Sequence, residues 1–228
     1  VATKDELSSF VLKEVQKEKL YDFLREMEFN RLLSRTINFY GETTKKNAES
    51  SATKTNSNKI NTKDYESITN AKVLDKWVKI LNKQSVIAVD TETSSLNPLE
   101  ADLVGISFSY APNKACYIPL GHKNTQGIKK DLVLKNIKPL LEDPSIKKVG
   151  QNIKFDFIIL KQNAIEINPI EDTMLISYTL DAGINRHNLD TLSEIHLNHK
   201  TISYKELVGT GKNKLNFSDI ELDKATEY

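Results

Sequence analysis

Apolar and polar positions alternate in short blocks from about residue 60 onward. Apolar runs at residues 85–89, 103–110 and 114–119 are separated by turn residues and predict three strands of an antiparallel meander. A fourth short strand is predicted at residues 147–150. Amphipathic spacing predicts helices around residues 73–81, 131–141, 152–163, 172–180, 189–197 and 217–228. We therefore expect an α/β domain with a mixed sheet flanked by helices.

The first forty residues follow a different pattern. Between residues 17 and 35, Leu20, Phe23, Leu24 and Met27 recur at helical spacing, which predicts a helical region. Residues 41–60 are polar and contain almost nothing to bury, as is typical of a flexible linker. The expected organisation is a helical tail (1–40), a linker (41–60) and a main domain (61–228).

Composition limits the function classes. The 228 residues carry a formal charge of +1, whereas a protein that coats duplex DNA is usually more basic, so any nucleic-acid contact should be local. No apolar run approaches the roughly 20 residues of a membrane span. The single cysteine, Cys116, excludes an internal disulfide and is expected to be a buried structural thiol, which fits a reducing cytoplasm. The N-terminus has neither Met nor a signal sequence, so the chain is expected to be part of a longer protein.

The strongest candidate for chemistry is the run from Val86 to Thr93. Side chains alternate along a strand, so Asp90 and Glu92 project to the same face. Two neighbouring carboxylates repel each other, and a divalent cation such as Mg²⁺ or Mn²⁺ removes that repulsion. An acid at a strand end is, however, more often a cap or a turn residue.

A second candidate lies where a strand gives way to a helix. Asn152 and Asp156 are four residues apart and share one helical face. Taken singly, Asp156 could equally be an ordinary acid in the first turn of a surface helix. The third element is the last pair of residues, Glu227 and Tyr228, although a terminal Tyr by itself normally has no functional meaning.

Together these pieces resemble the 3′–5′ exonuclease (proofreading) domain of bacterial family A DNA polymerases of the DNA polymerase I type, a DEDD exonuclease with a ribonuclease-H-like fold. The resemblance covers roughly residues 64–228 and is carried by residues 86–96, 103–109, 117–119, 138–143, 149–156, 172–175, 186–190 and 209–213. Upstream, residues 23–33 resemble the C-terminal end of the 5′-nuclease domain that precedes proofreading in such polymerases.

The resemblance implies a set of catalytic residues. Asp90, Glu92 and Asp156 would be ligands of two Mg²⁺ or Mn²⁺ ions, and Tyr228 would orient the attacking water. The family has a further Asp four residues after this Tyr, a position beyond Tyr228 in the parent protein. The segment alone is therefore expected to lack one ligand and could be inactive.

Further matches fall on family positions that touch the DNA. These are Thr91, Leu96, Gln151, Asn152, Arg186 and Tyr204. For Leu96 and Tyr204, packing in the core is an equal alternative. The segment 209–214 resembles a phosphate loop without its full spacing, so a flexible basic loop is the simpler interpretation. Lys147 and Lys148 are expected to be solvated.

The implied function is removal of 3′-terminal nucleotides from single-stranded DNA by hydrolysis, with release of 5′-mononucleotides. The expected partners are a DNA 3′ end, a polymerase domain C-terminal to this segment and a 5′-nuclease domain N-terminal to it, in a monomeric bacterial cytoplasmic protein with no membrane contact. One alternative is an inert spacer domain, which would be expected to lose the three carboxylates. The other is an RNA-trimming exoribonuclease, against which the upstream helices argue.

Overall fold

The computed structural model describes residues 10–11, 14–42, 60–211 and 214–228. The chain divides into two compact units, residues 1–54 and 55–228. Among the helices of the described residues, none combines the length and apolar character that crossing a membrane requires. Most of the predicted linker, residues 43–59, lies outside the described residues.

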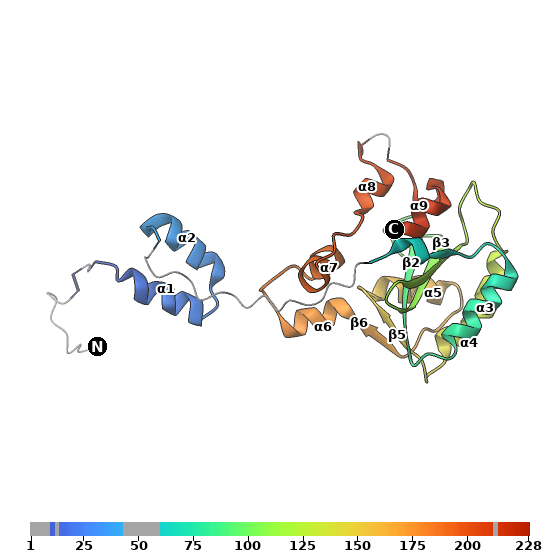
Figure 1. The fold of residues 1–228 in the computed structure, drawn as a ribbon, viewed down its shortest axis with the longest axis horizontal. Coiled ribbons are helices and arrows are strands. Elements are labelled where there is room, and N and C mark those ends of the chain that lie inside the picture. Colours follow the sequence, from blue (N-terminus) through green and yellow to red (C-terminus); the bar gives the residue numbers. More distant parts are fainter. Residues whose placement is uncertain (1–9, 12–13, 43–59, 212–213) are drawn as a thin grey trace. The chain divides into compact units, whose positions relative to one another are not determined.

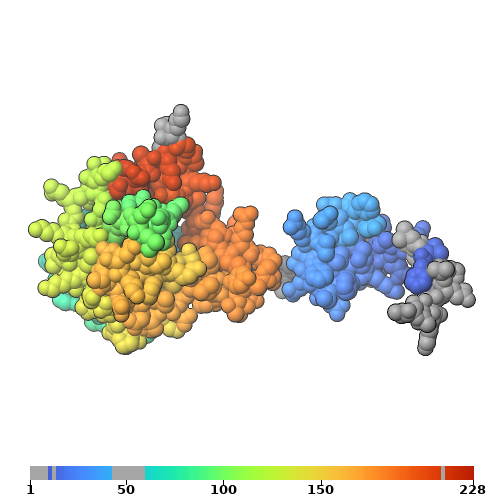
Figure 2. All heavy atoms as spheres, turned by 180° about the vertical axis from the view of Figure 1, so that it is seen from behind, coloured from blue at the N-terminus to red at the C-terminus, as the bar shows by residue number. Residues whose placement is uncertain are grey.

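Where the structure describes it, the first unit contains two helices, α1 (Lys17–Glu26) and α2 (Asn30–Tyr40), drawn in blue in Figures 1 and 2. The predicted helical region is interrupted at Glu28, whose φ of 54° is incompatible with a continuous helix. Tyr21 is buried, and its hydroxyl donates a 2.7 Å hydrogen bond to the carbonyl oxygen of Gly41. This aromatic side chain of α1 thereby connects α1 to the residue that follows α2.

The second unit is built on a six-stranded sheet with the order β1-β4-β3-β2-β5-β6. As predicted, β2 (Val86–Thr93), β3 (Leu103–Ala111) and β4 (Lys114–Pro119) form an antiparallel meander. The predicted strand β5 (Lys147–Gly150) pairs parallel to β2. The pattern missed the two edge strands, β1 (Glu66–Ser67) and β6 (Ile170–Asp172), which pair parallel to β4 and β5.

Three helices cover one face of this sheet: α3 (Ala71–Leu81), α4 (Lys130–Glu142) and α5 (Lys154–Gln162), visible in Figure 1. Their apolar side chains form one cluster with the inward residues of the strands, among them Ile87, Val89 and Ile106. Cys116 belongs to this cluster and is 2% exposed, so the predicted buried thiol is confirmed.

The C-terminal part of the chain contains α6 (Thr173–Leu180), α7 (Leu189–Leu197), α8 (Tyr204–Val208), the 3₁₀ helix η4 (Phe217–Asp219) and α9 (Leu222–Glu227). Of these, α8, η4 and α9 pack on the opposite face of the sheet. Val104 and Tyr117 of the sheet form a second cluster with Val208, Phe217 and Ile220. The predicted helix 217–228 is therefore two short helices, and α8 was not predicted.

One expectation about charge was wrong. Lys148, predicted to be solvated, has no exposed surface and donates hydrogen bonds to the backbone carbonyls of Asp143 (2.6 Å), Ile146 (2.7 Å) and Asn168 (2.5 Å). Burial lowers the pKa of its ammonium group. The side chain joins β5 to the segment that precedes it and to the segment that precedes β6. Its neighbour Lys147 is exposed and pairs with Glu171 at 2.9 Å.

Candidate active site

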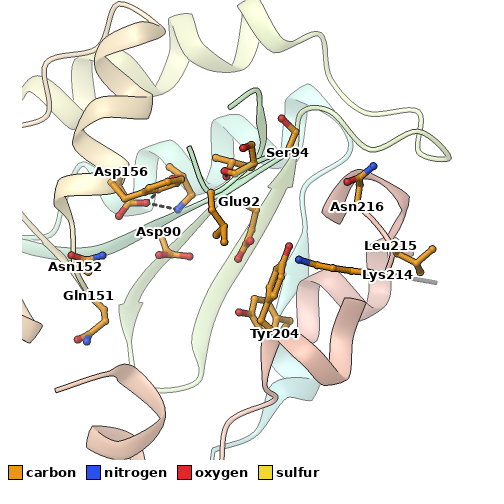
Figure 3. Close-up of a pocket in the computed structure, with 16 residues that line it drawn as sticks. Asp90, Glu92, Ser94, Gln151, Asn152, Asp156, Tyr204, Lys214, Leu215 and Asn216 are labelled. Carbon is orange, nitrogen blue, oxygen red and sulfur yellow. Dashed lines mark hydrogen bonds between the residues drawn. The ribbon is translucent and has the colours of Figure 1, made fainter. Parts of the chain in front are cut away.

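Every predicted site residue except Arg186 lines one open pocket of about 440 Å³. Figure 3 shows Asp90, Glu92 and Asp156 near one another, with Gln151 and Asn152 on one flank and Tyr204 on the other. The pocket is lined by Asp90, Thr91, Glu92, Thr93, Ser94, Ser95, Leu96, Gln151, Asn152, Phe155, Asp156, Tyr204, Lys214, Leu215, Asn216 and Tyr228. Segments far apart in the sequence thus meet at one place.

Strand β2 supplies the first two acids. It continues past the predicted residue 89 to Thr93, so Asp90 and Glu92 lie inside the strand and on one face. In the pairing with β3, Asp90 lies opposite Ser107 and Glu92 opposite Gly105, before the register shifts between Glu92 and Thr93. The two carboxylates therefore stand side by side on the sheet face that carries the second apolar cluster.

The third acid, Asp156, comes from the first turn of α5 and is held by Thr91. Asp156 Oδ1 accepts hydrogen bonds from the Thr91 backbone N–H (2.8 Å) and from the Thr91 hydroxyl (2.6 Å). This is possible because the ladder between β2 and β5 ends at Ala88, which leaves the edge of β2 open at Thr91. Thr91 thus holds the Asp156 carboxylate in place, and this role does not depend on whether Thr91 also contacts the substrate.

The surroundings of the three acids raise their pKa values. Desolvation by burial is the largest cause that raises the pKa of Glu92 to about 9, and repulsion from the charges of Asp90 and Asp156 adds to it. Desolvation and the charge of Asp156 raise the pKa of Asp90. Desolvation also raises the pKa of Asp156, against the lowering effect of the Thr91 hydrogen bonds. Negative charge is therefore costly in this pocket unless a cation accompanies it.

The turn between β5 and α5 shapes the second flank. Asn152 has a φ of 57°, a conformation that Asn tolerates better than most residues, and its backbone N–H donates a 2.9 Å hydrogen bond to Asp172 Oδ1. This turn is why the helix begins at Lys154 and not at the predicted residue 152. Gln151 accepts a hydrogen bond from Thr173 (2.6 Å) and donates one to the carbonyl oxygen of His187 (2.8 Å).

The rim of the pocket is apolar and aromatic. Leu96 is 82% exposed, so the alternative of a core position is wrong for this residue. Tyr204 lines the pocket and also packs against the second apolar cluster. Tyr228 is 42% exposed, and its ring lies 6.1 Å from that of Phe217, centroid to centroid.

Sequence reasoning missed Lys214 as a pocket residue. Its ammonium nitrogen lies 5.3 Å from the centroid of the Tyr204 ring, as a cation–π contact. The only signal in the sequence is the basic character of the segment 209–214, which does not by itself point to the pocket. Residues 212–213 of that segment lie outside the described residues.

Arg186 is the one predicted residue that the pocket does not include. It is exposed in the loop between α6 and α7. The next residue, His187, is bonded through its carbonyl oxygen to Gln151, so the loop is anchored to the pocket flank. The predicted contact of Arg186 with substrate stays a prediction.

The three carboxylates are suitable ligands for a hard divalent cation, because such cations prefer oxygen ligands. A bound cation would also stabilise the ionised carboxylates, which burial and mutual repulsion disfavour. In the described part of the chain, however, no three His, Cys, Asp or Glu side chains already form a group that could hold a metal ion. One oxygen of Asp156 is turned toward Thr91. The second carboxylate oxygen of Asp156 takes no part in these two hydrogen bonds.

Solved structures with the same fold include nucleases. The exonuclease domain of Nibbler from Aedes aegypti matches 75% of this chain and 85% of its own, with a TM-score of 0.55 and 12% identity. Escherichia coli RNase D, an exoribonuclease, matches 64% of this chain and 36% of its own, with a TM-score of 0.52 and 20% identity. At such identities the likeness concerns the ribonuclease-H-like fold alone.

Sequence comparisons are more specific. DNA polymerase I of Rhizobium leguminosarum is 40% identical in an alignment of 187 positions that covers 72% of this chain and 18% of the polymerase. DNA polymerase I of Pseudomonas aeruginosa is 35% identical in an alignment of 222 positions that covers 94% of this chain and 24% of the polymerase. The chain thus spans less than a quarter of the length of these relatives. A family model described as 3′–5′ exonuclease matches residues 65–228. The chain belongs to the 3′–5′ exonuclease domain family of DNA polymerase I.

Proposed function

We propose that this chain is the proofreading part of a bacterial DNA polymerase and hydrolyses the 3′-terminal phosphodiester of single-stranded DNA to release 5′-mononucleotides. The observation that carries the proposal is the convergence of Asp90, Glu92 and Asp156 on one pocket together with Tyr228. The match of residues 65–228 to a 3′–5′ exonuclease family supports the reaction class.

In this proposal Asp90, Glu92 and Asp156 hold two Mg²⁺ or Mn²⁺ ions. Such ions, when bound, activate a water molecule and neutralise the leaving 3′ oxygen. The raised pKa of Glu92 supports this assignment, because a cation would favour the ionised carboxylate that the apo pocket disfavours. Thr91 positions Asp156 through two hydrogen bonds, and the Tyr228 hydroxyl would orient the attacking water.

The 3′ end of the strand would lie along the rim. Exposed Leu96 could wedge against the terminal bases, and Tyr204 offers a ring for base stacking, which tolerates any sequence. Lys214 adds a positive charge to the lining of the same pocket and could pair with a backbone phosphate. Gln151, Asn152 and Arg186 would provide polar contacts to the strand.

The proposal includes further domains. The Pseudomonas aeruginosa polymerase matches 94% of the chain, which includes much of the first unit and supports the interpretation of that unit as the end of a 5′-nuclease domain. A polymerase domain would follow Tyr228 in the parent protein. A monomer in the bacterial cytoplasm is the expected setting.

The test uses the complete polymerase that contains this segment. With Mg²⁺ or Mn²⁺ it should shorten a 5′-labelled single-stranded DNA from its 3′ end, and EDTA should stop the reaction. Asp90→Ala should lower the rate by at least about 10³-fold, because it removes a charged group on which the reaction centre depends. Asp75→Asn, which alters an exposed acid of α3 far from the pocket, is the matched control and should leave the rate unchanged.

Two outcomes would contradict the proposal. Undiminished digestion by Asp90→Ala would refute the site, and no digestion by the unaltered polymerase would favour the inert spacer. An RNA strand of the same sequence, assayed in parallel, separates a deoxyribonuclease from an RNA-trimming enzyme, since the two substrates differ only in the 2′-hydroxyl and the thymine methyl.

A further inference from the structure

A buried histidine, His122, joins the end of β4 to the C-terminal helices. Its Nε2 lies 2.7 Å from the Tyr117 hydroxyl, and its Nδ1 lies 2.9 Å from the carbonyl oxygen of Ile220, 98 residues further along the chain. The imidazole also makes edge contacts with the rings of Tyr117 and Phe217, at centroid distances of 5.6 and 5.9 Å. His122 is only 8% exposed, so both hydrogen bonds are shielded from water.

The partners fix the tautomer of His122. The Ile220 carbonyl can only accept, so Nδ1 must carry the proton and donate it. Nε2 of the neutral ring is then an acceptor, and the Tyr117 hydroxyl donates to it. Burial lowers the pKa of His122, which favours this neutral form. The result is a directed chain of hydrogen bonds from Tyr117 through His122 to Ile220.

One end of this chain lies beside the carboxylates. The Tyr117 phenol crosses directly over Gly105, where an added Cβ would come within 1.9 Å of the hydroxyl oxygen. Gly105 is the β3 residue opposite Glu92. The charges of Glu92 and Asp90 contribute, after burial, to a raised pKa of Tyr117. The phenol therefore stands next to the acids on the same face of the sheet.

The other end leads to Tyr228. Ile220 lies two residues before α9, and Tyr228 follows the end of that helix, with its backbone N–H bonded to the carbonyl oxygen of Lys224 at 3.0 Å. The ring of Phe217, which contacts His122, also contacts Tyr228. Lys123 adds a second attachment through Ser218 (2.9 Å) and Asp219 (2.6 Å).

We propose that Tyr117 and His122 are positioning residues that hold α9, and with it Tyr228, at a fixed place relative to Glu92. They do not touch the reacting atoms themselves. Because a misplacement of about 1 Å can cost a large factor in rate, a tether of this kind would matter for turnover more than for substrate binding. The catalytic part of this inference rests on the proposed function.

The first test of the tether, meaning the hydrogen bonds from Tyr117 through His122 to Ile220, does not require a measurement of enzyme activity. In the 228-residue chain, His122→Phe keeps an aromatic ring against Tyr117 and Phe217 but removes both hydrogen bonds. We expect amide hydrogen exchange of the backbone of α9 to speed up by about tenfold. His122→Asn should largely restore slow exchange, because an Asn side-chain amide can donate to Ile220 as Nδ1 does. His196→Phe, which replaces an exposed imidazole on α7, should leave α9 unchanged.

The same substitutions in the complete polymerase test the consequence for catalysis. At a temperature where circular dichroism shows each variant fully folded, His122→Phe should lower kcat of the exonuclease about tenfold and change KM less than about twofold. His122→Asn should recover most of the rate, and Tyr117→Phe should lie between them.

Each arm can overturn a different claim. Unchanged exchange of α9 in His122→Phe would overturn the tether whatever the activity. A kcat as low in His122→Asn as in His122→Phe would overturn the hydrogen bond to Ile220 as the cause. If the unaltered polymerase had no exonuclease activity, the proposed function would fail and the positioning role with it, while the exchange experiment would still decide the tether.

Discussion

Glu92 shows most clearly how the fold places an energetically unfavourable carboxylate in the proposed active site. An apolar strand and two neighbouring acids surround it, and these raise its pKa from 4.5 to about 9. A proton on Glu92 relieves this cost, and a cation bound in the proposed site would relieve it as well. Stability and function are thus opposed at this residue, as expected of an active site.

This opposition gives a pH dependence with a definite sign. Between pH 4.5 and about 9 the folded metal-free chain holds a proton on Glu92 that the unfolded chain releases, so stability is lost as the pH rises through this interval. Glu92→Gln removes the ionisation and should raise the free energy of unfolding by ~1–2 kcal/mol at pH 8, with little effect at pH 4.5. Thermal denaturation in EDTA across this range measures it.

Glu100→Gln is the matched control, because Glu100 is exposed. It should leave the pH dependence of stability as it is in the unaltered chain. If Glu92→Gln and the unaltered chain lost stability in parallel over the whole pH range, the environment described for Glu92 would be wrong.

Two of the proposed catalytic acids, Asp90 and Glu92, could be identified from the sequence because strand alternation places them on one face. Asp156 was found through the family motif, since nothing local distinguishes it from an ordinary acid in a first helical turn. Lys214 could not be found, because its place depends on the ring of Tyr204, ten residues away in the chain.

At the scale of elements, the long central strands and helices were predictable and the short ones were not. Strands β2, β3 and β4 have enough residues for a pattern of alternation, whereas β1 has two residues and β6 three. Those two strands form because they pair with β4 and β5, respectively. A local sequence pattern does not contain this long-range pairing. The start of α5 depends likewise on Asp172, which lies 20 residues from Asn152.

Lys148 gives a test at this scale. Lys148→Met keeps most of the apolar stem but leaves the carbonyls of Asp143, Ile146 and Asn168 without their buried donor. We expect a loss of ~2–3 kcal/mol in the free energy of unfolding, measured by urea denaturation. The exposed neighbour provides the comparison: Lys147→Met breaks only the surface pair with Glu171 and should cost less than about 1 kcal/mol. Equal losses for the two variants would mean that the buried hydrogen bonds contribute nothing.

At the scale of the whole molecule, the site is a product of topology. Residue Thr91 and residue Asp156 are 65 positions apart, yet two hydrogen bonds join them where β2 extends past its partner β5. Tyr228 reaches the same pocket from the end of the chain. The sequence alone placed these residues together only through the family resemblance, because spacing does not report how a sheet brings distant segments into contact.

The division into two units leads to the last prediction. Every member of the two apolar clusters of the sheet lies between residues 68 and 225, so the second unit has a complete core of its own. A chain that begins at Thr55 should therefore unfold cooperatively and with a Tm within about 2 °C of the 228-residue chain, measured by differential scanning calorimetry. A loss of ~1 kcal/mol would by itself lower the Tm by about 2–4 °C in a domain of this size. A larger drop, or a broadened transition, would show that residues 1–54 stabilise the exonuclease unit.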